Sequence, residues 1–228
     1  MPIGLIGAYR DKNSPIRGWI PSESIAQCED TVPLSDSTGH RQTDDNQTDS
    51  TIWNAMIAPL KRLRLTSVIW YQGESDAALQ PDLYGCLLQA MVNGWRNNFY
   101  RGVSLPFGIV QLGTRNFDDV QGATPLLRWE QTAEYGQVPN EALVRVFMAS
   151  AIDLPDPESP FGSHVPRYKE EIAKRLLAGV LSVLYYRHIP FQGPFPQRTY
   201  LVKDDVFIEY DQDFNFMNVV ENFEVCSR

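Results

Sequence analysis

The stretch Val68-Ile69-Trp70-Tyr71-Gln72-Gly73-Glu74-Ser75-Asp76-Ala77 decides the fold of this chain. Its first half is β-branched and aromatic, which favours a buried strand. The run stops at the polar turn Gln72–Ser75, and a longer segment with helical spacing follows. Ligands of open α/β folds bind at the carboxyl edge of the sheet, where such strand ends deliver polar side chains. Gly73 would let the backbone approach a neighbouring group closely.

Length and charge narrow the classes of partner. With 228 residues, the chain can bury one large domain or one and a half. The hydrophobic fraction of 43% and the charged fraction of 21% are ordinary for a globular protein. A net charge of -8 argues against nucleic acid and against an anionic membrane surface, since both attract basic proteins. A small or sugar substrate is compatible with this charge.

The sequence shows neither a membrane span nor a metal motif. No stretch is long and apolar enough to cross a bilayer, and residues 1–8 lack the basic leader of a secretory signal. No Cys-x-x-Cys pair occurs, so we expect no zinc or redox motif and no cofactor. Two interpretations stay open for Cys28 and Cys86: a disulfide in an oxidising compartment, or separate thiols.

Predicted strands and helices alternate along most of the chain. Short apolar segments predict strands at residues 2–8, 66–71, 107–112 and 144–150. Helical spacing predicts helices at residues 52–60, 83–95, 126–135 and 168–186. Such alternation is typical of a parallel sheet covered by helices on both faces. The sequence therefore predicts an α/β fold of three layers, α/β/α.

The pattern changes near the carboxyl end of the chain. Residues 200–202 and 206–210 read as short strands around the turn Lys203-Asp204-Asp205. We therefore expect one α/β domain over residues 1–192 and the start of a β-rich region over residues 193–228.

Polar side chains follow three of the predicted strands. They are Gln72, Glu74 and Ser75, with Gly73 among them, after the second strand, Gln111 after the third, and Asp153 after the fourth, with Asp156 and His164 in the loop beyond. A carboxylate and a histidine are the orienter and the general base of a hydrolytic triad. The Gln72 amide and nearby backbone N–H groups would stabilise an oxyanion.

Each of these residues also has a structural interpretation. Gln72–Glu74 would be a polar turn whose glutamate caps the next helix, and Asp153 would be another cap. His164 would then be an exposed loop residue. Asp and His are common in loops, so the constellation alone does not select a reaction.

Several segments carry a resemblance to a known family. The chain resembles the sialate O-acetylesterases, a carbohydrate-esterase group within the SGNH hydrolases, over residues 2–193. The most specific motif is Tyr71-Gln72-Gly73-Glu74-Ser75. The other segments, in the family's order, are residues 2–6, 53–57, 68–77, 106–112, 128–133 and 153–169.

The resemblance implies a flavodoxin-like α/β sheet and removal of O-acetyl groups from sialic acids or related carbohydrates. It further implies a Ser-His-Asp mechanism without metal, in lysosomes or outside the cell. By motif, Gln72 and Gly73 match the oxyanion segment, and Asp153 is the best match for the triad acid.

The chain departs from the family pattern at three places. The family nucleophile lies in a Gly-Gln-Ser-Asn segment upstream of the first strand, and no residue here matches it. The family's Trp-Gly-Gly-Thr segment is replaced by residues 9–14, which contain no glycine. The family's Ser-Ile-His-Pro reads Ser163-His164-Val165-Pro166 here, so His164 stands one place early, which in an extended loop reverses the direction of the side chain.

Three hypotheses follow for the function. The chain is the remainder of an esterase domain with little activity of its own, or a non-catalytic module that binds glycans or a partner on the same fold. In the third, an unrelated esterase uses Ser75 as nucleophile, although no base for it is evident. The first hypothesis predicts an exposed sheet edge, and therefore aggregation, where the upstream segment would pack.

Overall fold

A parallel three-stranded sheet forms the centre of the molecule. The computed structural model describes residues 3–10, 14–31, 49–100, 105–113, 123–162, 166–203 and 205–213. The strands lie in the order β1 (Val68–Trp70), β2 (Phe107–Gln111) and β3 (Val146–Ser150), all parallel. Phe107 of β2 lies opposite Val68 on one side and Val146 on the other. The predicted α/β class with a parallel sheet is confirmed.

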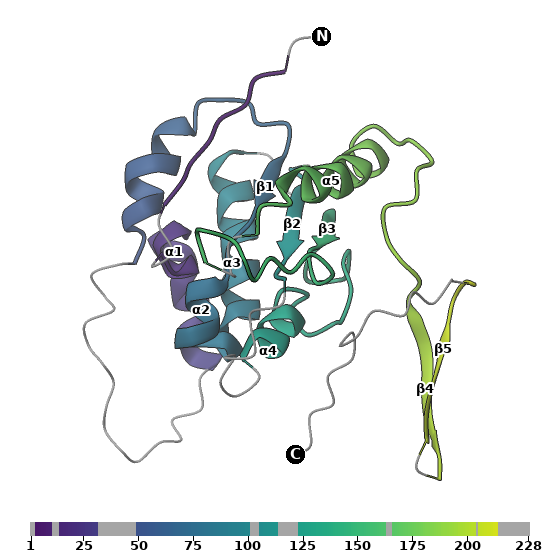
Figure 1. The fold of residues 1–228 in the computed structure, drawn as a ribbon. Helices are drawn as coiled ribbons and strands as arrows, with labels where there is room; N and C mark the ends of the chain where they lie inside the picture. The colour runs from purple at the N-terminus through teal and green to yellow at the C-terminus, as the bar shows by residue number, and fades with distance from the viewer. Residues whose placement is uncertain are drawn as a thin grey trace, which may run out of the picture.

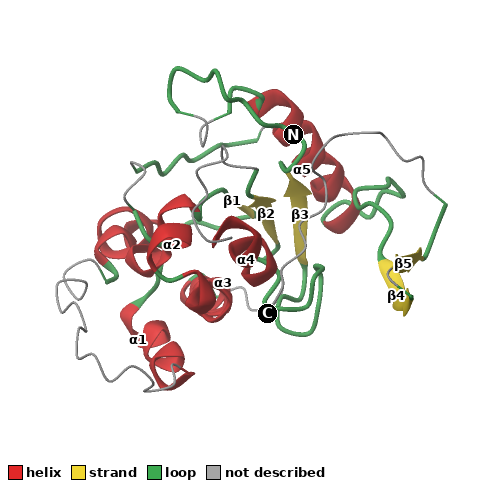
Figure 2. Cartoon of the chain, turned by 60° about the horizontal axis from the view of Figure 1, so that its bottom comes forward, coloured by secondary structure: helices red, strands yellow, loops and turns green. Residues whose placement is uncertain are grey.

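Several short helices come before β1 in the chain, and further helices alternate with the strands. The longest are α3 (Tyr84–Asn98) and α5 (Lys169–Val183), followed by α4 (Ala123–Glu130) and α2 (Glu74–Leu79). The shorter ones are η1 (Ile16–Trp19), α1 (Ser22–Ile25), η2 (Ala26–Thr31), η4 (Trp53–Ile57), η5 (Ala58–Leu60) and η6 (Pro81–Leu83). A two-stranded antiparallel hairpin of β4 (Pro196–Val202) and β5 (Asp205–Tyr210) comes last. It stands apart from the sheet in both views (Figure 1, Figure 2).

The two faces of the sheet are covered by different helices (Figure 1, Figure 2). On one face, Trp95 of α3 contacts Trp70 of β1 and Phe107 of β2, with ring centroids 6.4 Å and 6.0 Å apart. On the other face, α5 packs over β2 and β3, and Phe147 is buried there against Ile172 and Leu176. No helix among the described residues is long and apolar enough to cross a membrane.

Residues 3–10 do not form the strand predicted at residues 2–8. The described part of this segment has no strand partner, and Ile3 and Leu5 are 77% and 93% exposed. An apolar segment becomes a strand only where a neighbour pairs with its backbone groups. Within the described sheet β1 is an edge strand, and Ile69 is 47% exposed. The expected exposed edge is therefore present.

Helix α4 ends earlier than predicted. It stops at Glu130 rather than Tyr135, because Ala133 and Glu134 have positive φ angles of 52° and 66°. Those angles belong to the left-handed region and cannot continue an α-helix. After the end of the helix, the Thr132 hydroxyl, in place of a backbone carbonyl, accepts the N–H of Gly136 at 2.9 Å. The hairpin predicted at residues 200–210 is confirmed and begins four residues earlier, at Pro196.

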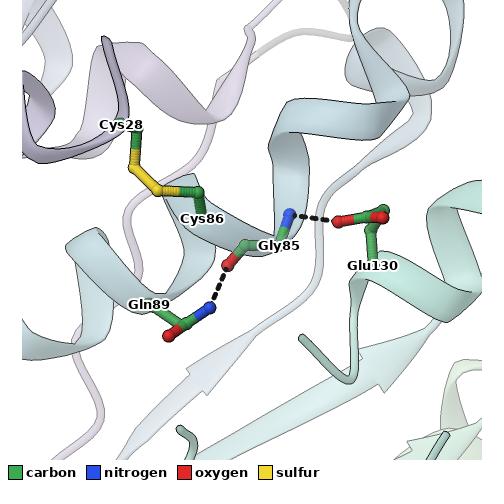
Figure 3. The surroundings of a disulfide bond; sticks show 5 residues. All are labelled: Cys28, Gly85, Cys86, Gln89 and Glu130. Carbon is green, nitrogen blue, oxygen red and sulfur yellow. Dashed lines mark hydrogen bonds between the residues drawn. A yellow bond between two sulfur atoms is a disulfide. The ribbon is translucent and has the colours of Figure 1, made fainter. Parts of the chain in front are cut away.

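A disulfide joins the amino-terminal helices to the layer beside the sheet (Figure 3). Cys28 of η2 and Cys86 of α3 are bonded, with an S–S distance of 2.02 Å. The sequence left open whether these two cysteines are bonded or are separate thiols, and the structure shows that they are bonded. Trp95 of α3 reinforces the same contact, since its indole N–H donates to the carbonyl of Trp19 at 2.9 Å.

Gly179 is expected to be the position in α5 that tolerates substitution least. A Cβ there would lie 2.3 Å from Cδ2 of Phe147, a ring that is fully buried. We expect Gly179→Ala to lower the free energy of unfolding by about 1–3 kcal/mol, through overpacking. Gly193→Ala is the matched control, because its Cβ would meet no atom within 4 Å. Urea unfolding of both variants measures the difference, and equal midpoints would contradict the packing argument.

Candidate functional site

The turn between β1 and α2 needs glycine at position 73. Gly73 has a φ of 146°, a value that side-chain-bearing residues rarely adopt. A Cβ there would also lie 2.7 Å from the side chain of Leu127 and 3.1 Å from that of Leu112. The close approach predicted for this glycine is therefore real, and the neighbours that require it are side chains of α4 and of the end of β2.

The buried hydroxyl of Tyr84 fixes the direction of this turn. It accepts the indole N–H of Trp70 at 3.2 Å and lies 3.1 Å from the backbone oxygen of Gln72, to which it donates. The C=O and N–H of a trans peptide point in opposite directions. The contact therefore turns the N–H of Gly73 away from Tyr84. Gly73 is buried, and this N–H donates to no residue in the described part of the chain. A fixed N–H without a partner is the kind of donor that an oxyanion hole uses.

The side-chain amide of Gln72 is engaged within the protein. Its Nε2 donates to the carbonyl of Ser14 at 3.1 Å, to the hydroxyl of Ser75 at 3.3 Å and to the carboxylate of Asp76. The predicted role of this amide toward an oxyanion would require exchanging one of those bonds. The backbone N–H of Gly73 requires no such exchange.

Asp76 anchors an earlier segment of the chain to the turn. Its two oxygens accept the backbone N–H of Ile16 at 3.2 and 3.1 Å, and the side chain is 5% exposed. Burial raises the pKa of Asp76 to about 6, although hydrogen bonds from Gln72 and Ile16 oppose the rise. Ser75 hydrogen-bonds within this cluster, its Oγ lying 3.4 Å from Asp76 Oδ2. Sequence reasoning did not identify Asp76, because its contact with Ile16 joins positions 60 residues apart.

Asp153 lies just after β3 and forms a bidentate ion pair with Arg175. Nη1 and Nη2 of Arg175 donate to its two oxygens at 2.6 and 2.7 Å, and Nη1 also donates to the carbonyl of Ser150 at 2.6 Å. These bonds lower the pKa of Asp153, so the carboxylate stays ionised. The side chain is 42% exposed, and a carboxylate with two occupied acceptor sites can accept a further N–H.

Asp156 is buried, and its carboxylate binds Arg167 through three hydrogen bonds. It accepts the backbone N–H, Nε–H and Nη2–H of Arg167 at 2.9, 2.7 and 2.8 Å, and 3% of the side chain is exposed. The Arg167 hydrogen bonds lower the pKa of Asp156. This carboxylate therefore closes the loop between residues 156 and 167. The predicted base, His164, falls in that loop and lies outside the described residues.

Helix α4 holds the end of β2 through two side chains that sequence reasoning did not assign to the site. Arg128 donates to the carbonyls of Leu112 and Gly113 at 2.9 and 3.2 Å. Gln131 accepts the N–H of Leu112 and donates to the carbonyl of Val110, both at 3.0 Å. Gln111, predicted at this strand end, accepts the hydroxyl of Ser150 on β3 at 2.8 Å. The only sequence signal for Arg128 and Gln131 was their place in a family segment.

The hydroxyl of Tyr84 should contribute to stability in addition to its buried ring. Tyr84→Phe keeps the ring but leaves the indole N–H of Trp70 and the carbonyl of Gln72 without their shared partner. We expect the free energy of unfolding to fall by about 1–3 kcal/mol, the usual cost of buried unpaired polar groups. Tyr185→Phe, at a tyrosine that is 50% exposed, is the control and should change little. Equal unfolding midpoints for the two variants would remove Tyr84 from the account of the turn.

Glu130 makes the stability of the fold depend on pH (Figure 3). It is 4% exposed, and its Oε2 accepts the N–H of Gly85 at 3.0 Å. Burial raises the pKa of Glu130 from 4.5 to about 7, and the charges of Glu134 and Asp82 add to the rise. The folded state therefore holds this proton more tightly than the unfolded state, so stability falls as pH rises from about 4.5 to about 7.

We expect Glu130→Gln to remove this loss, since an amide oxygen can accept the same N–H and does not ionise. The expected gain at pH 8 relative to wild type is up to about 3 kcal/mol, with little difference at pH 4. Glu209→Gln, at an exposed glutamate of β5, is the control. Urea midpoints between pH 4 and 8 test this, and parallel curves for wild type and Glu130→Gln would contradict it.

Comparisons with known proteins show the family to which the chain belongs. Residues 37–174 match the family model of carbohydrate esterases described as sialic acid-specific acetylesterases. The sialate O-acetylesterases of Homo sapiens and Rattus norvegicus are 39% and 42% identical to this chain, over 88% and 90% of it. The match covers 39% and 36% of those proteins, so the chain spans about two fifths of their length. A carbohydrate acetylesterase structure from Xanthomonas citri superposes with a TM-score of 0.69 at 25% identity, over 87% of this chain and 41% of that one.

Proposed function

Because the chain belongs to the sialic acid-specific acetylesterase family of carbohydrate esterases, we propose that it forms part of a hydrolase that removes O-acetyl groups from sialic acids or related carbohydrates. The observation that carries this proposal is the turn at Gly73, whose N–H is fixed in direction and has no partner among the described residues. The turn lies at the same carboxyl edge of the sheet as Asp153, because β1, β2 and β3 are parallel.

The two ends of this sheet edge have different roles in the proposed reaction: one holds the triad acid and base, and the other holds the oxyanion donor. A serine hydroxyl attacks the acetyl carbonyl and passes its proton to His164, while Asp153 orients the imidazole. The negative charge that forms on the carbonyl oxygen is stabilised by the N–H of Gly73. We favour Asp153 over Asp156 as the triad acid, since Asp156 is buried and accepts three N–H bonds from Arg167.

The nucleophile is the part that these residues do not supply. The sequence contains no Gly-Gln-Ser-Asn segment, and Ser75 hydrogen-bonds only with Gln72 and Asp76 among the described residues. We therefore propose that the serine comes from residues not included in this sequence, and that these 228 residues alone hydrolyse acetyl esters weakly or not at all.

A non-catalytic glycan- or partner-binding module on the same fold is the second candidate. It is favoured by the internal bonding of the Gln72 amide and of both loop carboxylates, which stabilises the edge without a nucleophile. Binding of acetylated sialosides without turnover, even after the serine segment of a family member is supplied, would distinguish this role from hydrolysis.

We also infer an oxidising compartment, lysosomal or extracellular, for the protein. The Cys28–Cys86 disulfide supports this, since disulfides persist in secretory compartments and are rare in the cytosol.

Two proteins test the proposed hydrolysis: the chain itself, and a chimera that joins to it the Gly-Gln-Ser-Asn region of a family member. With O-acetylated sialic acid as substrate, we expect near-background rates for the chain and clear turnover for the chimera. In the chimera, Asp153→Asn should lower kcat by roughly 10³–10⁴-fold, as expected for loss of a triad acid.

Asp205→Asn, at an exposed aspartate of β5, is the matched control and should keep the rate of the chimera. Robust turnover by the unmodified chain, abolished by His164→Ala, would disprove the need for an added nucleophile. A chimera that binds acetylated sialosides but never hydrolyses them would establish the binding module instead.

A further inference from the structure

A lysine ammonium lies beside the turn that carries the candidate oxyanion donor. Lys169 is the first residue of α5, and its Nζ lies 4.4 Å from the ring centroid of Tyr71 and 3.4 Å from the Tyr71 hydroxyl. Tyr71 directly precedes Gln72 and Gly73 in the turn. The contact therefore brings a positive charge from α5 to the end of β1, within a few residues of the proposed site of acetyl transfer.

The other basic side chains of this region are already paired. Arg167 and Arg175 bind Asp156 and Asp153, while Lys174 lies between Glu170 and Glu171 at 3.1 and 2.7 Å. Among the described residues between Asp153 and Val183, Lys169 is the basic residue with no carboxylate within 4.0 Å. The ammonium of Lys169 contacts Tyr71, and no ion pair with a carboxylate neutralises its charge.

Lys169 is exposed to solvent, so an anionic ligand can reach its ammonium. Desolvation lowers the pKa of Lys169, and the charge of Glu74 opposes the shift. The aromatic face of Tyr71 holds the group in place through a cation–π contact.

The proposed substrate class supplies the complementary group. A sialic acid carries a carboxylate that is ionised at neutral pH, whereas ordinary acetylated sugars are neutral. The chain has a net charge of -8 and therefore repels an anion at long range, so its binding requires a local cation. We infer that Lys169 binds the carboxylate of the sugar and makes the site selective for acidic over neutral carbohydrates. This inference rests on the proposed function, because it takes its ligand from it.

Binding of the sugar needs no nucleophile, so the 228-residue chain itself can be tested. We would titrate it, by calorimetry at low salt, with the methyl α-glycoside of N-acetylneuraminic acid and with the methyl ester of the same glycoside, which is neutral. We expect the acid to bind about tenfold or more tightly than the ester, as for a charge-assisted hydrogen bond. Lys169→Met should abolish the preference for the acid and leave the affinity for the ester unchanged. Lys169→Arg, which keeps the positive charge, should keep the preference for the acid.

Lys61→Met is the matched control. Its Nζ lies 5.5 Å from the ring centroid of Trp53, another cation over an aromatic ring, in a different part of the fold. It should leave both affinities as they are. Thermal unfolding checks that Lys169→Met keeps the fold, since the methionine stem can still pack on Tyr71; Lys169→Gln replaces it if that variant unfolds.

The outcomes separate this inference from the proposed function. If wild type binds acid and ester equally, or if Lys169→Met and Lys169→Gln keep the preference, the role of Lys169 is overturned and the proposed function stands. If wild type binds neither compound, the role of Lys169 is overturned as well, while the proposed function is decided separately by turnover of O-acetylated sialic acid by the chimera.

Discussion

One buried hydroxyl, that of Tyr84, is the constraint on which the carboxyl edge of the sheet depends. It joins the indole of Trp70 in β1 to the backbone of Gln72 in the turn, and it belongs to the first residue of α3. Strand, turn and covering helix therefore share one hydrogen-bonded atom. Asp76 acts from the other side of the turn by binding the N–H of Ile16. With both contacts present, the peptide between Gln72 and Gly73 has one orientation, and the φ of 146° at Gly73 can be maintained.

The carboxylates at the two ends of this edge are stabilised in opposite ways. Asp76 is buried among neutral donors, so its pKa rises to about 6. Asp153 and Asp156 each bind an arginine, which lowers the pKa of both. Asp153 and Asp156 in the loop after β3 thus keep their negative charges over the neutral range, whereas Asp76 in the turn after β1 is protonated under mild acid. A residue that orients a histidine must stay ionised while the histidine titrates, and Asp153 meets that requirement.

Local sequence patterns predicted the elements but not their partners. The strands at residues 68–70, 107–111 and 146–150 lie in short apolar runs, and the helices α3 and α5 have periodic apolar faces. These elements appear where they were expected. The segment at residues 2–8 has equally good strand residues, yet a strand also needs a paired edge, which composition does not reveal. Likewise Gln72 and Asp153 were found from their place after strands. Their partners Tyr84 and Arg175 were not, because long-range contacts leave no local signal.

The bonding of this edge explains why the Gln72–Ser75 motif indicates a family more reliably than an activity. Apart from the N–H of Gly73, the polar groups described here at the turn and at the Asp153 end are bonded within this chain: to Tyr84, Asp76 and Ser14 at the turn, and to Arg175 and Arg167 at the loop. None of these contacts involves a nucleophile. Selection for a folded edge would therefore preserve the motif whether or not a serine is delivered to it. Hydrolysis, in contrast, needs a hydroxyl and a base together at the N–H of Gly73. The fold of the edge and the chemistry performed there are thus separable properties of the sequence.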